Sequence, residues 1–421
     1  MDTLYLSGNK RGVIKMKKLF IIISLVVILS LGIVINNKKY KVDSEYLSIF
    51  IDNERVSEFP KKGEALYLKS SCDSDTSLEW DNTSWGLYVG NLDKKVKCNI
   101  YFQKTLGGSV RALAKEDNIN LASDDPDSNI RYIGSNPDNY VYFNCSDYNN
   151  QSDSTCEKWR IIGLFNNVTK SDNTKENLIR IVRNESVGEF SWDTSLSSVN
   201  SGNGINNWIQ SRLMKLLNTG YESENIGGSL YYNAKSGNCY AGQNNATTSC
   251  DFSTTGLKND ETRNAIETVI WNLGGISTYD DRIVSNAYKL ERGSTVYNDN
   301  PISWTGKIGL IYPSDYGYAA GGGSSTDRNS CLNASMYSWS DAAYSDCVIN
   351  NYLHKDDLSF WGLTVTSANE TYPFVIYSSG NVAGGLPSST NDVYPALYLK
   401  SDILITSGHG SEESPYQLGL S

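Results

Sequence analysis

The eight cysteines are the residues whose spacing most clearly predicts chemistry. They fall into four near pairs, separated by 26, 11, 11 and 16 residues, with much longer gaps between the pairs. Because closing a short loop costs less chain entropy than closing a long one, we expect sequential disulfides. The expected pairs are Cys72 with Cys98, Cys145 with Cys156, Cys239 with Cys250, and Cys331 with Cys347.

Metal binding is the rival interpretation of these cysteines. The sequence has no C-x-x-C pair, and its histidines are His354 and His409 alone. Structural zinc sites need four closely spaced thiolate or imidazole ligands. An even number of cysteines also leaves no unpaired thiol for nucleophilic chemistry. We therefore expect no metal, no cofactor and no reactive cysteine.

Hydrolytic chemistry has little support in the sequence. A glycosidase needs two carboxylates at a defined separation. Asp193, Asp315 and Glu370 can be nominated, but no spacing pairs them. A serine hydrolase needs a histidine base, and no G-x-S-x-G motif is present. We expect no catalytic residue and a protein that is not an enzyme.

Aromatic side chains beside a glycine run are the better candidates for ligand binding. In the segment YPSDYGYAAGGGSS, Asp315, Tyr316 and Tyr318 precede Gly321 to Gly323. Aromatic faces and a carboxylate on a flexible loop could line a ligand surface, although a plain solvated loop is the alternative. Trp361 in FWGLTV could stack on a sugar ring, although a tryptophan in a strand is more often part of the core.

These candidates need elements to position them, and the pattern predicts two folded parts. Residues 42–105 alternate apolar and polar positions in short runs between turn-forming clusters, which predicts a small all-β module. Residues 106–129 are polar and predict a linker. Its carboxylates Asp124, Asp125 and Asp127 could attract a cation, but they lack the spacing of a calcium loop.

Residues 130–421 mix strand and helix patterns, which predicts an α+β domain. Apolar periodicity and terminal glycines predict helices over about 206–221, 261–275, 280–293 and 333–350. Short β-like runs precede the first helix, recur at 304–312 and close the chain as a meander from residue 360.

An apolar segment near the N-terminus predicts membrane attachment. Residues 19–35 are seventeen uncharged residues, close to the lower limit for spanning a bilayer of about 30 Å. Lysines and one arginine are denser before this segment than after it, so we expect residues 1–18 to be a cytoplasmic tail. The chain would then be a single-pass protein of the cell membrane with its bulk extracellular. A cleaved signal peptide is the alternative, although no A-x-A-like site follows the run.

The charge distribution argues against nucleic acid as a partner. The formal net charge is −10, and beyond residue 41 there are 29 Lys and Arg against 46 Asp and Glu. Such an ectodomain should be repelled by nucleic acid and by anionic lipid.

Several segments of the larger part resemble a known family. CEKWRIIGLF, RNESVGEFSWDT, NNWIQSRLMKLLN, GLIYPSDYGYA and FWGLTV followed by YPALYLKS are similar to uncharacterised surface proteins of gut Bacillota and related bacteria. That resemblance implies a C-type-lectin-like fold over residues 130–421. The fold is distantly similar to that of formylglycine-generating, sulfatase-modifying enzymes, but the reactive cysteine pair of those enzymes does not carry over to Cys331 and Cys347.

The resemblance implies a location and a fold more than an activity. We expect a membrane-anchored extracellular protein of binding or adhesion type, whose ligand is a glycan or another surface protein. The motifs of calcium-dependent lectins are missing, so binding should not need calcium. An extracellular enzyme of the same fold with altered residues and a structural component of the cell envelope are the alternatives.

Overall fold

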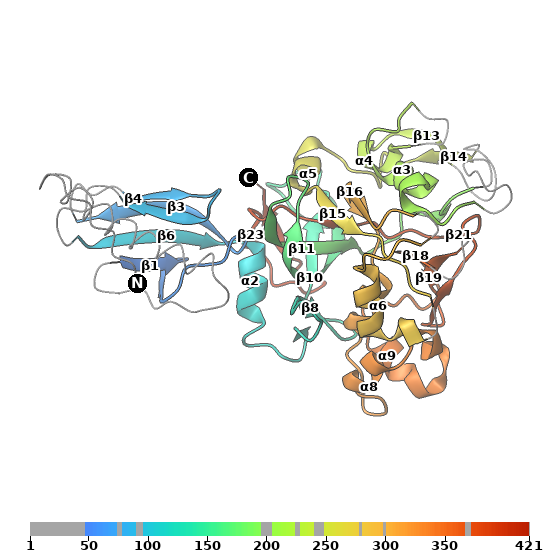
Figure 1. Ribbon diagram of the computed structural model, residues 1–421. Coiled ribbons are helices and arrows are strands. Elements are labelled where there is room, and N and C mark those ends of the chain that lie inside the picture. The colour runs from blue at the N-terminus through green and yellow to red at the C-terminus, as the bar shows by residue number, and fades with distance from the viewer. Residues whose placement is uncertain are drawn as a thin grey trace, which may run out of the picture. The chain divides into compact units, whose positions relative to one another are not determined.

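The computed structural model describes residues 47–73, 78–89, 96–194, 204–223, 228–239, 248–277, 280–297, 300–366 and 372–420. Within them the protein is a mixed α+β structure dominated by strands, with 36% strand and 19% helix. It divides into two compact units, Met1–Gly108 and Ser109–Ser421 (Figure 1). No helix in these ranges is long and apolar enough to cross a membrane. The predicted cytoplasmic tail 1–18 and membrane segment 19–35 lie outside the described residues.

The smaller unit is a four-stranded sheet with a hairpin packed on one face. Strands β2, β1, β6 and β3 lie in that order, with β1 parallel to β6 and the other pairs antiparallel, and β4 pairs with β5. The strands are β1 (Leu47–Ile51), β2 (Glu54–Val56), β3 (Ala65–Cys72), β4 (Leu78–Asp81), β5 (Gly86–Val89) and β6 (Cys98–Lys104).

Alternation of apolar residues builds the core of this unit. Ile100 and Phe102 of β6 point to the same face of the sheet and pack with Ile49 against Trp80 and Trp85 of the hairpin region. The disulfide between Cys72 and Cys98 joins directly paired residues of β3 and β6.

The linker predicted over 106–129 is wrong, because this segment is folded. It forms helix α2 (Leu106–Leu113) and strand β7 (Leu121–Ala122), which pairs with β8 (Ile130–Tyr132). Asp125, one of its expected solvated carboxylates, is 4% exposed. The boundary between the two units lies within α2, between Gly108 and Ser109.

A seven-stranded sheet forms the centre of the larger unit. Its order is β17-β22-β11-β10-β8-β7, with β9 also paired to β10, and every pair is antiparallel. Most residues of β10 and β11 are buried, as expected for strands covered on both faces. The remaining members are β9 (Tyr140–Phe143), β10 (Glu157–Thr169), β11 (Lys175–Arg183), β17 (Ile308–Gly309) and β22 (Ala396–Tyr398).

A second sheet has five strands in the order β12-β21-β18-β19-β20, in which β18 and β21 are parallel. These are β12 (Glu189–Ser191), β18 (Phe360–Val365), β19 (Pro373–Ile376), β20 (Val382–Gly384) and β21 (Thr390–Asp392). Three two-stranded pairs complete the strands: β13 (Ser236–Cys239) with β14 (Thr248–Asp251), β15 (Val269–Asn272) with β16 (Ser303–Gly306), and β23 (Leu404–Ser407) with β24 (Gln417–Gly419).

The helices of the larger unit are short. Those of α type are α3 (Arg212–Leu217), α4 (Leu230–Asn233), α5 (Asp260–Ala265), α6 (Val284–Glu291), α7 (Pro313–Ala319), α8 (Arg328–Asn333) and α9 (Ser345–Ile349). Single 3-10 turns are η1 (Trp208–Gln210), η2 (Asp280–Arg282), η3 (Met336–Ser340) and η4 (Ala342–Tyr344). In Figure 1, α6, α8 and α9 gather at one end of this unit.

Two expected helices are not continuous in the structure. The helix predicted over 261–275 ends at Ala265, because the following Val-Ile-Trp segment pairs as β15 with β16. The helix predicted over 333–350 is divided into η3, η4 and α9. By contrast, the helix expected over 280–293 is present as η2 and α6, and the one over 206–221 as η1 and α3, divided where the Ser211 side chain caps α3.

Candidate functional site

The predicted ligand residue Asp315 lies in the interior rather than on a loop. Its segment forms helix α7, which begins at Pro313, and Asp315 caps it by accepting a hydrogen bond of 2.8 Å from the Tyr312 amide. One oxygen of Asp315 accepts from Arg131 Nη1 at 2.8 Å and the other from Arg180 Nη1 at 2.6 Å. Asp315 is 1% exposed, so its carboxylate has a structural role in the interior.

Asp315 belongs to a buried charge cluster that neutralises itself. The cluster is Asp125, Arg131, Arg180 and Asp315, and Arg131 Nε also donates to Asp125 at 2.7 Å. Burial would raise the pKa of Asp315, but the charges of Arg180 and Arg131 outweigh it and hold that pKa below its usual value. Two carboxylates and two guanidinium groups thus balance one another in charge, while Arg131 Nη2 and Arg180 Nε are buried without a hydrogen-bond partner.

Aromatic rings enclose both arginines of this cluster. The guanidinium carbon of Arg131 lies 4.6 Å from the centre of the Phe165 ring and 5.1 Å from that of Tyr318. That of Arg180 lies 4.8 Å from the centre of the Trp271 ring. Such cation–π contacts favour the charged form in a water-poor interior.

A further buried carboxylate, Glu291, was missed by sequence reasoning. Glu291 ends helix α6, is 0% exposed, and accepts hydrogen bonds from the amide and hydroxyl of Ser314 and from Arg292 Nη1. Burial raises its pKa to about 7, against the opposing effects of Arg292 and Ser314. The available signal was helical spacing, because Val284, Ala287, Tyr288 and Glu291 share the buried face of α6.

The aromatic candidates do not form a ligand surface. Tyr316, Tyr318 and Trp361 are 0%, 2% and 1% exposed. Tyr316 packs against Trp339 and donates to a backbone carbonyl at Gly380, 3.1 Å away. Trp361 donates from Nε1 to a backbone carbonyl of β12. The prediction that the two tyrosines are exposed is therefore wrong, and Trp361 is a core residue, as the alternative interpretation had it.

The glycine run after these tyrosines forms a closed turn. Gly321 donates to the Asn350 carbonyl at 2.7 Å, and Gly323 packs so close to Asp346 that a Cβ would lie 2.6 Å from its carboxyl carbon. Asp346 also accepts from the amides of Ser325 and Thr326. Cys347, bonded to Cys331, follows directly. This segment is thus tied to its surroundings.

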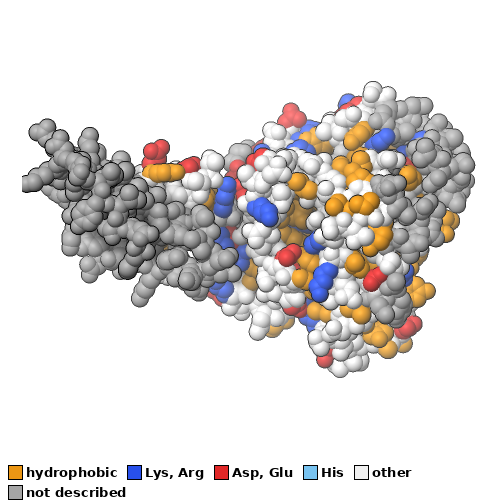
Figure 2. All heavy atoms as spheres, viewed as in Figure 1, with side chains coloured by type: hydrophobic (Ala, Val, Ile, Leu, Met, Phe, Trp, Pro, Cys, Tyr) orange, Lys and Arg blue, Asp and Glu red, His pale blue; other side chains and the backbone are white. Residues whose placement is uncertain are grey.

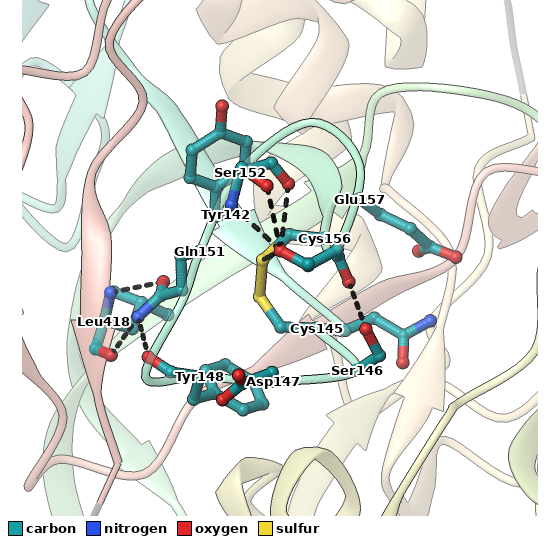
Figure 3. The surroundings of a disulfide bond; sticks show 12 residues. Tyr142, Cys145, Ser146, Asp147, Tyr148, Gln151, Ser152, Cys156, Glu157 and Leu418 are labelled. Atoms are coloured by element: carbon teal, nitrogen blue, oxygen red, sulfur yellow. Dashed lines mark hydrogen bonds between the residues drawn. A yellow bond between two sulfur atoms is a disulfide. The ribbon is translucent and has the colours of Figure 1, made fainter.

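The four expected cysteine pairs are the pairs that the structure joins, and no cysteine in the described ranges is free. Figure 3 shows the disulfide of Cys145 with Cys156, which closes the loop between β9 and β10. The Gln151 amide donates to the Leu418 carbonyl and accepts from the Leu418 amide, tying the loop to β24. The Tyr148 hydroxyl bonds to a hydroxyl of α5. These contacts identify a structural staple.

The residues nominated for hydrolysis are not brought together as a catalytic pair. Asp193 is fully buried and accepts from the backbone amides of Ile205 and Arg212. Glu370 lies outside the described residues. Burial lowers the pKa of His354, which lies 3.5 Å from the Asp356 carboxylate. Within the described ranges, no group of three or more His, Cys, Asp or Glu side chains is placed to hold a metal.

One small hollow opens in the larger unit. Its cavity volume is about 10 Å³, whereas pockets for drug-sized ligands hold roughly 300 Å³ or more. The Asn207 side chain in its wall caps η1, and the Asn300 amide donates to Asn206. Its lining is Asn206, Asn207, Trp208, Leu273, Asn300, Pro301, Leu363 and Val365.

The surface offers scattered apolar side chains. Figure 2 shows hydrophobic, charged and polar groups interspersed over the face of the larger unit that it draws. Tyr337 of η3 is 46% exposed, and the guanidinium of Arg282 lies 4.9 Å from the centre of its ring.

Searches of protein-family models, curated proteins and solved structures find no match to this chain.

Proposed function

We propose that the chain is an exported surface protein, anchored in the cell membrane by residues 19–35, with its two folded units outside. The observation that carries this proposal is the set of four disulfides, all of which follow the apolar segment. Disulfides form and persist in oxidising compartments and are rare in the cytosol.

We further propose that residues 130–421 have a C-type-lectin-like fold and act as a binding or adhesion module without catalysis. The segments that carry the family resemblance support the fold, because WRIIGLF lies in β10, FWGLTV in β18 and YPALYLKS around β22, all within the two sheets. The mixed α+β composition agrees with it.

Binding rather than catalysis is supported by the buried carboxylates, which form ion pairs with buried arginines. In the buried charge cluster, Asp125 and Asp315 are bonded to Arg131 and Arg180. The observation that favours an enzyme instead is the raised pKa of Glu291, since general acids and bases work near neutral pH. Both oxygens of Glu291, however, accept hydrogen bonds from its neighbours.

A glycan and surface-protein array tests the binding function. Full-length protein in detergent micelles should bind one class of immobilised ligand in a saturable way, and a chelator should leave that binding unchanged. Reduced and unfolded protein is the control for adhesion by exposed apolar groups. Turnover of an arrayed compound without stable binding would contradict the proposal and favour the enzyme.

A further inference from the structure

The small hollow described above is built by η1, strand β18 and the ends of the β15–β16 pair. Leu363 and Val365 occupy alternate positions of β18 and therefore line it from one face of that strand. On the opposite side the Leu273 amide donates to the Ile302 carbonyl at 2.8 Å, which fixes the end of β15. A cavity of about 10 Å³ has room for one water molecule or one hydroxyl group.

A buried hydrogen-bond donor in this wall has no partner. Trp208 lines the hollow and is 2% exposed, and its indole Nε1 makes no hydrogen bond. Neighbouring rings hold the indole in place, because its centre lies 5.1 Å from that of Trp192 and 5.8 Å from that of Trp304. A buried donor left unpaired costs free energy, so a group that accepts a hydrogen bond from Nε1 binds favourably.

Two asparagines add an open donor and an open acceptor to the same wall. Asn207 Oδ1 accepts from the amides of Ile209 and Gln210, whereas its Nδ2 donates to no acceptor among the described residues. Asn300 Nδ2 donates to Asn206 Oδ1 at 3.3 Å, whereas its own Oδ1 accepts from no donor in the same ranges. Neither atom is among the polar atoms buried without a partner, so solvent reaches both.

We propose that this hollow is the subsite for one hydroxyl group of a neutral sugar. A hydroxyl both accepts and donates, so it can accept from Trp208 Nε1 or Asn207 Nδ2 and donate to Asn300 Oδ1. A methyl group can do neither. Among the described residues, no charged side chain lines the hollow, so a charged ligand would find no counter-charge there.

A sugar suits this subsite better than a flexible side chain of a protein. Its hydroxyls stand on a rigid ring, so little conformational entropy is lost when one of them is held. Pro301, a lining residue that is itself exposed, offers an apolar surface to the C–H face of the ring. The subsite deepens the proposed binding function, on which it rests, by giving the class of ligand.

Titration of the full-length protein with small neutral ligands tests the subsite. Ligand-observed NMR, in a detergent without sugar headgroups, would compare the methyl glycosides of glucose, galactose and mannose with their fully O-methylated counterparts and with N-acetylserine methylamide. At least one methyl glycoside should saturate a single site. Its O-methylated counterpart cannot donate a hydrogen bond and should bind at least about tenfold more weakly.

Two variants test whether the hollow is the site of binding. Asn300→Ala removes the acceptor and should weaken glycoside binding about tenfold. Val365→Ile adds one methylene to the wall, which fills a hollow of this size and should abolish saturation. Asn150→Ala, at an exposed asparagine whose side chain makes no hydrogen bond in the described ranges, is the matched control and should bind like wild type. Urea unfolding shows which variants are folded, and either of the first two suffices for the test.

Each outcome of the titration has a defined meaning. If none of the three glycosides saturates a site, the hollow holds an ordered water only, and the proposal is overturned. Equal binding of the O-methylated compounds or tighter binding of the serine derivative also overturns it. So does a folded Asn300→Ala or Val365→Ile protein that binds the glycoside like wild type.

The same variants separate this subsite from the proposed function. If an arrayed partner binds wild type and Asn300→Ala equally well, the binding function stands and the hydroxyl subsite is wrong. If a methyl glycoside saturates the subsite while no arrayed partner binds, the subsite stands and the proposed surface-binding function is wrong.

Discussion

Asp315 accepts a hydrogen bond of 2.6 Å from Arg180, a residue 135 positions earlier in the chain. Its other oxygen pairs with Arg131, 184 positions earlier. One carboxylate thus joins helix α7 to strands β8 and β11 of the central sheet. All three groups are buried. A buried charge without a partner is costly, so each of these charges is stabilised by the opposite charge beside it.

Replacing Asp315 should therefore destabilise the protein strongly. Asp315→Asn keeps the shape of the side chain but leaves two buried guanidinium groups without their shared counter-charge, at a cost of about 3–5 kcal/mol in the free energy of unfolding. Urea denaturation measures the loss. Asp356→Asn, whose side chain is 95% exposed, is the control and should shift stability by about 0.5 kcal/mol at most. Equal effects of the two variants would contradict the structural role of Asp315.

Glu291 should make stability depend on pH near neutrality. Its pKa of about 7 in the folded protein lies above the usual 4.5, so the folded state keeps a proton that the unfolded chain releases between these values. Its contribution is therefore present below pH 4.5 and is lost as the pH rises through 7, by about 3 kcal/mol.

The measurement is urea unfolding of wild type and Glu291→Gln across this pH window. Arg292 and Asp315 are the charged groups that face Glu291. The lowered pKa of Asp315 affects stability only below its usual value of 3.8, outside the window. The variant should lose the part of the pH dependence that Glu291 contributes, whereas the contribution of His354, whose pKa is lowered from 6.5 and whose stabilisation is lost as the pH falls, remains in both proteins. Parallel curves for the two proteins would show that Glu291 does not titrate there.

Tyr316 should behave as a core residue. Tyr316→Ala removes a ring that is 0% exposed and packed against Trp339, which should cost about 3 kcal/mol or more. Tyr337→Ala, at a tyrosine 46% exposed, is the matched control, with an expected loss of about 1 kcal/mol at most, since it removes an exposed ring and its cation–π contact with Arg282. Thermal or urea unfolding distinguishes them. A small loss of stability for Tyr316→Ala would contradict a core position and favour the exposed loop that the sequence alone predicts.

Peptide mapping without reduction should recover the four sequential disulfides. Removing one by combining Cys145→Ala with Cys156→Ala should lower stability by about 2–4 kcal/mol, because the unfolded chain gains freedom and the loop tied to β24 loses its closure. Combining Ser152→Ala with Ser154→Ala in the same loop is the control. A disulfide joining the smaller unit to the larger one would be incompatible with this structure.

Local features of the fold were predictable from the sequence. The cysteine pairs are close along the chain, so spacing alone identified their partners. Apolar periodicity predicted α6, and Gly293 marked the end of the expected helix. These signals are local, and they depend on neighbours within a few turns or one short loop.

The interior of the larger unit was not predictable in the same way. Asp315, Tyr316 and Tyr318 stand in a polar, glycine-rich segment, and only partners far along the chain make them buried. Asp125 stands in a polar segment and therefore looked like a solvated linker residue. The sequence does not show that its partner, Arg131, is buried by aromatic rings from distant parts of the chain. Long-range contacts override local composition at each of these positions.

The most direct test of the proposed export is protease accessibility in intact cells. With a tag at the N-terminus and another at the C-terminus, added protease should remove the C-terminal tag and digest both folded units, while the N-terminal tag stays protected in a membrane-bound fragment. Permeabilised cells are the control and should lose both tags. An intact C-terminal tag under the same treatment would contradict a surface location, and a mature chain that lacks residues 1–35 by mass would replace the anchor with a cleaved signal peptide.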